Sequence, residues 1–123
     1  MKSKETVTWL PKPEAHNFPA AQSYLNLLYD ESISADIVKR LKGSSKVEFK
    51  AKDIFRASGL SLLGVSNFHV DVDKKKIKKG IPLSPILLVR DGALGKVIIA
   101  DGYHRLCAVY IFDEDAVVPC RII

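Results

Sequence analysis

Short apolar segments alternate with polar and turn-forming residues along the chain, and their periodicity predicts helices and strands. Apolar residues recur at helical spacing within residues 19–29 and 34–43, so we expect two helices in the first third of the chain. In the second helix, Ser34 is expected to cap the first turn and Gly43 to end the last one. Residues 46–50 then alternate between polar and apolar side chains, which is typical of a half-buried strand.

The middle of the chain predicts two short helical segments separated by irregular structure. Asp53 is expected to cap a helical turn that Gly59 stops, and Asp73 is expected to cap a short basic helix over residues 74–79. Residues 60–68 are apolar but are interrupted by glycine and asparagine, so we predict no regular element there.

The last third predicts a hairpin, a buried helix and a closing strand. Residues 85–89 and 96–100 are apolar, and the Asp-Gly pair between them is a strong hairpin signal. Residues 103–112 are apolar on nearly every side of a helix, and residues 117–122 again fit a strand. These elements together predict an α/β (α+β) fold with a small mixed sheet and surrounding helices.

Length and composition fit one small globular domain of 123 residues. No apolar run is long enough to span a bilayer and no signal peptide is recognisable, so we expect a cytoplasmic protein without a membrane partner. The two cysteines, Cys107 and Cys120, are too few for a disulfide framework and are expected to be buried thiols.

Positive charge is concentrated in the middle of the chain. The whole chain carries a net charge of +5, but residues 39–79 alone contain twelve basic residues and four acidic ones. Such a segment can bind nucleic acid or a nucleotide, and it can also be an ordinary solvated helix face. The lysines that we consider for contact with nucleic acid are Lys74, Lys75, Lys78 and Lys79.

Residues 101–108, which read Asp-Gly-Tyr-His-Arg-Leu-Cys-Ala, carry the strongest functional signal. An apolar strand leads through a glycine into a helix, and the first amides of a helix have no partner within it. Anions bind at such a helix start. We therefore expect Gly102, Tyr103, His104 and Arg105 to hold phosphate, with Lys76 as a further donor from the basic helix.

Two side chains of this segment have more than one interpretation. Asp101 is expected to cap the helix, or else to bind Mg²⁺ together with a nucleotide. Arg105 requires an anion, which is either phosphate or a carboxylate, that of Asp101 or another one. His104 and Asp101 are the weak candidates for catalysis, and His16 and His69 show no metal-ligand spacing.

The segment 101–108 resembles the signature of the ParB/sulfiredoxin superfamily, and the resemblance extends from Ile77 to the end of the chain. It includes a proline-containing lead into a strand at residues 81–89 and a closing strand at residues 117–123. The resemblance implies a ParB/sulfiredoxin-like domain over residues 45–123, with residues 1–44 as a helical N-terminal extension packed on it.

The resemblance implies binding of ATP or CTP with Mg²⁺, and NTP hydrolysis or phosphotransfer as the associated chemistry. Sulfiredoxin activity is not expected, because the position of its catalytic cysteine is Tyr103. The Glu-Asn-x-x-Arg motif of chromosome-partitioning relatives is not found. The alternatives are a DNA-binding or nuclease-like protein that uses the basic segment, and a catalytically inactive scaffold that binds a partner through its N-terminal helices. A homodimer is also considered.

Overall fold

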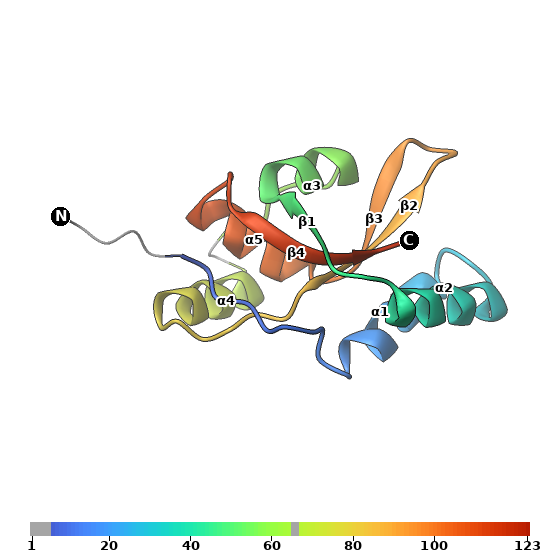
Figure 1. Ribbon diagram of the computed structural model, residues 1–123. Helices are drawn as coiled ribbons and strands as arrows, with labels where there is room; N and C mark the ends of the chain where they lie inside the picture. Colours follow the sequence, from blue (N-terminus) through green and yellow to red (C-terminus); the bar gives the residue numbers. More distant parts are fainter. Residues whose placement is uncertain (1–5, 65–66) are drawn as a thin grey trace.

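The computed structural model describes residues 6–64 and 67–123, which form five α-helices and one four-stranded sheet (Figure 1). This arrangement confirms the predicted mixed fold class. None of the helices in these residues combines the length and the apolar character needed to cross a membrane. The elements in chain order are α1 (Asn17–Leu25), α2 (Glu31–Gly43), β1 (Val47–Lys50), α3 (Ala51–Ser58), α4 (Phe68–Lys78), β2 (Ile86–Asp91), β3 (Lys96–Asp101), α5 (Tyr103–Phe112) and β4 (Val117–Ile122).

The sheet is mixed and has the strand order β1-β4-β2-β3. Strands β2 and β4 pair in parallel at its centre, whereas β1 pairs antiparallel with β4 and β3 pairs antiparallel with β2. The predicted hairpin joins β2 to β3, and the Asp91 carboxylate accepts a hydrogen bond of 3.2 Å from the Leu94 amide in its turn. The predicted strand at the end of the chain is β4, which lies beside β2.

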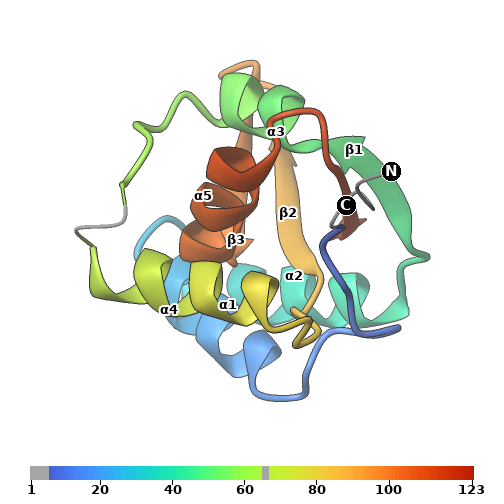
Figure 2. The same cartoon turned by 90° about the vertical axis from the view of Figure 1, so that its left-hand side faces the viewer.

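Helices cover both faces of the sheet, and this explains the continuous apolar run of β2. Leu87 and Val89 pack in one cluster with residues of α1 and α2, whereas Ile86 and Leu88 pack in another with residues of α3 and α5. A strand that is buried on both faces has no polar positions to alternate with apolar ones. Figure 2 shows α4 packed beside α5, on the same side of the molecule.

Several predicted helix starts are wrong, although the helices themselves exist. Asp30, not Ser34, caps α2, because its carboxylate accepts the Ile33 amide at 3.0 Å; the Ser34 side chain is buried one turn later. The first helix ends at Leu25, and the turn after it contains Tyr29.

The two helices in the middle of the chain also begin earlier than predicted. Helix α3 begins at Ala51 after Lys50, and Asp53 lies inside its first turn, while Gly59 ends it in the left-handed conformation as expected. Helix α4 begins at Phe68 after Asn67, so Asp73 lies in its middle and caps nothing. The predicted irregular stretch is present over residues 60–64, and residues 65–66 lie outside the described part of the chain.

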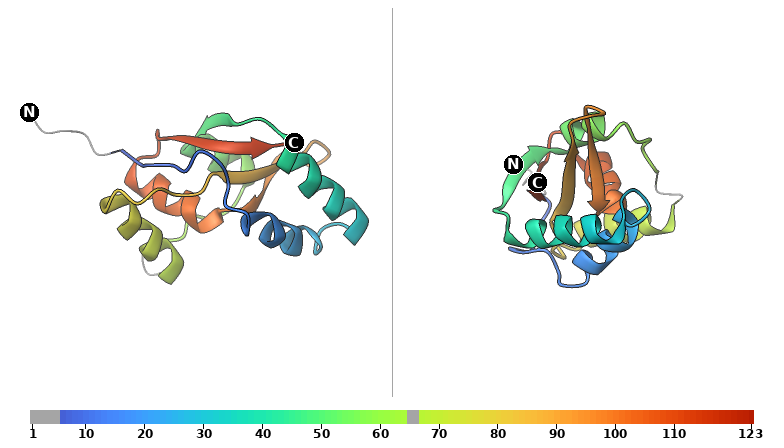
Figure 3. Two further views of the ribbon diagram at one scale, coloured as in Figure 1. Left: turned by 60° about the horizontal axis from the view of Figure 1, so that its bottom comes forward. Right: turned by 90° about the vertical axis from the view of Figure 1, so that its right-hand side faces the viewer.

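The segment before α1 is hydrogen-bonded to the segment that leads into β2. Leu10 donates its amide to the Leu83 carbonyl at 2.8 Å, and Leu83 donates to the Thr8 carbonyl at 2.8 Å. The buried hydroxyl of Ser84 accepts the Glu14 amide at 3.0 Å and the side-chain amide of Asn17. The N-terminal segment therefore runs alongside the start of β2, as the left view of Figure 3 shows.

Candidate functional site: a cavity at the start of helix α5

The start of α5 has no side-chain cap. Gly102 occupies the cap position with a φ of 107°, and no side chain in the described residues accepts a hydrogen bond from the amides of the first turn. The first internal bond of the helix runs from the Leu106 amide to the Gly102 carbonyl at 2.9 Å. Asp101 precedes the cap position, so the expectation that Asp101 caps α5 is wrong. The amides of residues 103–105 are left for water or a ligand.

Glycine is required at position 102 by conformation and by packing. The left-handed φ disfavours residues with a side chain. In addition, a Cβ atom at this position would lie 2.5 Å from Ile86 Cδ1 and 2.8 Å from Arg105 Nη2. The tight turn alone therefore accounts for this glycine, and close approach of a phosphate is a further, separate prediction.

Arg105 and Asp101 form an ion pair beside this turn. Arg105 Nη2 donates to Asp101 Oδ2 at 3.0 Å and to the Pro85 carbonyl at 3.3 Å, and each charged side chain is 18% exposed. Of the two anions proposed for Arg105, the carboxylate is the one that the structure shows. Arg105 Nε is buried without a hydrogen-bond partner, so this guanidinium keeps an unused donor.

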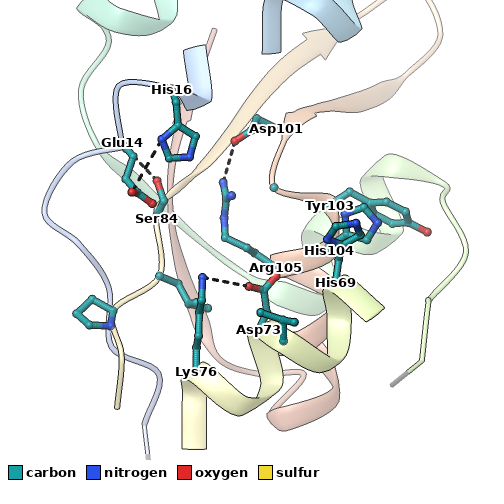
Figure 4. A pocket seen from close by; sticks show the side chains of 14 residues that line it. Glu14, His16, His69, Asp73, Lys76, Ser84, Asp101, Tyr103, His104 and Arg105 are labelled. Atoms are coloured by element: carbon teal, nitrogen blue, oxygen red, sulfur yellow. Dashed lines mark hydrogen bonds and ion pairs between the residues drawn. The ribbon is translucent and has the colours of Figure 1, made fainter. Parts of the chain in front are cut away.

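A cavity of about 290 Å³ opens at the start of α5 (Figure 4). Its wall combines the segment before α1, helix α4, the lead into β2 and the first turn of α5. The charged and titratable side chains that line it come from segments far apart in the sequence: Glu14, His16, His69, Asp73, Lys76, Asp101, Tyr103, His104 and Arg105.

Asp73 is the most buried carboxylate of this wall, with 8% of the residue exposed. Its nearest cation is Lys76, whose Nζ lies 4.0 Å from Asp73 Oδ1. Burial raises the pKa of the Asp73 carboxyl above its ordinary value, and the positive charge of Lys76 and then of Arg105 opposes the shift, followed by His104 and His69. Helix α4 thus presents a buried acid and a half-buried base to the same cavity.

Two histidines meet on the other side of the cavity. The rings of His69 on α4 and His104 on α5 have centroids 4.9 Å apart. Burial lowers the pKa of His104 and the neighbouring His69 lowers it further, while Asp73 opposes the shift, so the surroundings favour the neutral imidazole. The His104 imidazole can accept or donate a hydrogen bond, and a bound anion would favour its protonated form.

The Tyr103 side chain takes no part in the polar centre of the cavity. Its ring lies beside that of His104, with centroids 5.6 Å apart, and its hydroxyl donates to the Ser61 carbonyl. Burial is the main cause that raises the pKa of this phenol. The backbone amide is therefore the part of Tyr103 that can contact an anion.

The residues predicted to bind phosphate lie together, whereas the lysines considered for nucleic acid do not line this cavity. Gly102, His104, Arg105 and Lys76 all belong to its wall, as does the Tyr103 residue. Among the other lysines of α4 and its end, Lys75 forms an exposed ion pair with Asp71 at 3.1 Å. Lys78 and Lys79 are exposed, and Lys74 is half-buried.

Four titratable residues of the cavity were missed as site residues by sequence reasoning: Glu14, His16, His69 and Asp73. Glu14 and His16 are brought there by the pairing of the N-terminal segment with the lead into β2, and His69 by the packing of α4 on α5; neither contact leaves a local signal in the sequence. Asp73 did leave one, because Val70, Asp73 and Ile77 are the buried positions of α4 and have helical spacing.

The carboxylates of the cavity do not by themselves provide a metal site. Asp101, the residue considered for Mg²⁺, is held by Arg105. Within residues 6–64 and 67–123, no group of three or more His, Cys, Asp or Glu side chains is arranged to hold a metal ion.

Comparisons with models of protein families, with curated proteins and with solved structures found no match to this chain. The resemblance to the ParB/sulfiredoxin superfamily therefore stays a prediction from the residues of the 101–108 segment and its context.

Proposed function

We propose that the cavity at the start of α5 binds the phosphate groups of a nucleoside triphosphate, ATP or CTP. The observation that carries this proposal is the uncapped first turn of α5, which opens beside the side chains of Arg105 and Lys76. The free amides and the positive end of the helix dipole favour an anion, and phosphate has the oxygens to accept several of these donors at once. His104 adds a donor on the same turn.

Two of the three carboxylates that line the cavity, Asp101 and Asp73, are compatible with this proposal because each is close to a cation; the third, Glu14, lies beside His16. Asp101 neutralises Arg105 and Asp73 lies near Lys76 while no ligand is bound. A bound phosphate would share these cations with the carboxylates and would use the Arg105 Nε donor if the side chain turned toward it. The net gain in affinity therefore comes from the amides, the guanidinium and the lysine together.

The size of the cavity indicates which part of a nucleotide it would enclose. About 290 Å³ is at the lower limit of typical small-ligand sites. It suits a phosphate chain with part of the sugar, and it leaves the base near the rim. Hydrolysis or phosphotransfer would require a nucleophile at this site in addition to phosphate binding.

Calorimetric titration of ATP, CTP, GTP and tripolyphosphate, each with Mg²⁺, tests the proposal. We expect the wild-type protein to bind tripolyphosphate and at least one nucleotide, and Arg105→Ala to weaken both by about 10-fold or more, as for loss of a charged hydrogen bond. Lys76→Ala should weaken binding by a smaller factor. Absence of heat with every one of these ligands would exclude the proposed site.

Matched controls come from exposed residues of the same type. Lys78 lies on α4 outside the cavity, and Arg56 is exposed on α3. Lys78→Ala and Arg56→Ala should leave phosphate affinity within about twofold of the wild type, since screened surface charges contribute little. Equal losses in Lys76→Ala and Lys78→Ala would indicate a diffuse charge effect instead of a site.

The same variants test the DNA-binding alternative. If the basic segment binds DNA, affinity should fall steeply with salt and should be reduced by removing Lys78 and Lys79, whereas Arg105→Ala should have little effect. Binding of DNA without any binding of nucleotide would favour this alternative.

A further inference from the structure

Asp73 has an unusual environment for a buried carboxylate. It lies in the middle of α4, faces the cavity, and is 8% exposed. Among the described residues none donates a hydrogen bond to its carboxylate, and the Lys76 ammonium at 4.0 Å is its one ion-pair partner there. Figure 4 shows Asp73 in the wall together with Arg105 and His104.

Such a position is unfavourable for the folded chain on its own. A carboxylate taken out of water loses its hydration, and hydrogen bonds normally replace it. Asp101, in the same cavity, has this compensation because it accepts a bond from Arg105 at 3.0 Å. At Asp73, the lone pairs that face the cavity stay free for donors that a ligand or water brings.

The chemistry of those donors follows from what a carboxylate accepts. The oxygens of a phosphate group repel a carboxylate, whereas a hydroxyl group can donate a hydrogen bond to it. Asp73 and the first turn of α5 line one cavity, so a single ligand can reach both. A ligand that satisfies both has a phosphate chain and a free hydroxyl close to it.

We propose that Asp73 accepts a hydrogen bond from a hydroxyl of the bound ligand, so that the cavity selects phosphate esters bearing a free hydroxyl, such as a ribonucleotide, over inorganic polyphosphate. This inference rests on the proposed phosphate site and adds the group that the site recognises next to the phosphates. Asp73 is then the residue that determines specificity, and the α5 turn supplies the phosphate affinity.

The test compares ATP with 2′,3′-dideoxy-ATP, and CTP with 2′,3′-dideoxy-CTP, on wild type and on Asp73→Ala by calorimetry. We expect the wild type to bind a ribonucleotide about 10-fold or more tightly than its dideoxy analogue, as for a hydrogen bond to a charged group. Asp73→Ala should bind the two about equally. Tripolyphosphate should bind to Asp73→Ala as tightly as to wild type or more tightly, because a negative charge has been removed.

A control and a second substitution keep the result interpretable. Asp71 lies on the same helix, pairs with Lys75 and does not line the cavity, so Asp71→Ala should retain the wild-type discrimination. Asp73→Asn keeps the shape and one acceptor oxygen, so its discrimination should lie between wild type and Asp73→Ala. Circular dichroism of each variant verifies that the helices are retained.

Two results would overturn the inference while leaving the phosphate site intact. One is wild-type protein that binds tripolyphosphate and both members of each nucleotide pair with equal affinity. The other is an Asp73→Ala variant that keeps the full preference for the ribonucleotide. If tripolyphosphate and the nucleotides all fail to bind, the phosphate site itself is wrong and the inference fails with it.

Discussion

Helices α4 and α5 lie side by side, yet their N-terminal turns are completed in different ways. At the start of α4, the Asn67 side chain accepts the amides of His69 at 3.0 Å and Val70 at 3.3 Å. At the start of α5, Gly102 has no side chain to offer, and no other side chain in the described residues takes its place.

This difference indicates that the start of α4 is purely structural, whereas the start of α5 is a candidate binding site. A capped turn has part of its hydrogen-bonding capacity satisfied by the protein, and an uncapped one leaves that capacity available. The uncapped turn of α5 is also where Arg105, Lys76 and His104 converge, while the capped turn of α4 begins with the exposed Phe68. The following substitutions change one member of the comparison at a time.

Replacing Gly102 should have the largest effect. Gly102→Ala places a Cβ atom 2.5 Å from Ile86 Cδ1 at a left-handed φ, so the turn must shift. We expect the free energy of unfolding to fall by about 3 kcal/mol, from backbone strain and overpacking together. Urea denaturation measures this loss. In Gly43→Ala, by contrast, the added Cβ meets no atom within 4 Å, and stability should be retained or slightly raised.

Removing the cap of α4 should have an intermediate effect on stability and none on phosphate binding. Asn67→Ala deletes the acceptor of two amides, and such a loss costs about 1 kcal/mol. Tripolyphosphate affinity should stay within about twofold of wild type, because the cap lies outside the cavity wall. A large loss of affinity in a well-folded Asn67→Ala protein would show that the two helix starts are not independent.

The pH dependence of binding should give the smallest effect. Because the pKa of His104 is lowered in the free protein, a bound phosphate should promote its protonation, and affinity should rise a few-fold as pH falls through the histidine range. The other titratable or charged groups facing this site are His16, His69, Asp73, Lys76, Asp101 and Arg105, with Glu14 near His16. In His104→Gln, phosphate affinity should depend less on pH across the histidine range, because the contribution of His104 is removed.

The stability of the free protein should change with pH in the opposite direction to the phosphate affinity. A lowered pKa means that the unfolded chain binds the proton more readily, so His104 reduces stability as pH falls below its ordinary titration range. Thermal unfolding of wild type and His104→Gln without ligand should therefore diverge below about pH 6.5, with the variant losing less stability. A steeper loss in the variant would contradict this assignment.

Much of the fold was predictable because its local patterns agree with its packing. The apolar runs of β2 and β3 with the Asp-Gly turn between them, and the apolar helix α5 before β4, occur where the sequence predicts them. The start of α4 was not predictable in the same way. The prediction took Asp73 as a cap and so began this helix too late, although Val70, Asp73 and Ile77 have helical spacing.

The proximity of Gly102, His104 and Arg105, which we propose to bind phosphate, was likewise predictable because they are neighbours in sequence, and the cavity wall includes them all. His16 and His69 could not be added from the sequence. The approach of His16 depends on the pairing of the N-terminal segment with Leu83 and on the hydrogen bonds of Ser84, which span about 70 residues, whereas His69 is brought beside His104 by the packing of α4 on α5. No local pattern encodes such a contact.

Amide chemical shifts recorded by ¹⁵N NMR during titration with ATP and with tripolyphosphate test the central claim most directly. The account predicts that the largest changes occur at the amides of Tyr103, His104 and Arg105. The amide of Ile33, which Asp30 caps on α2, should not move. Binding of either ligand that leaves the amides of the first α5 turn unchanged would contradict the account, and so would the absence of any binding.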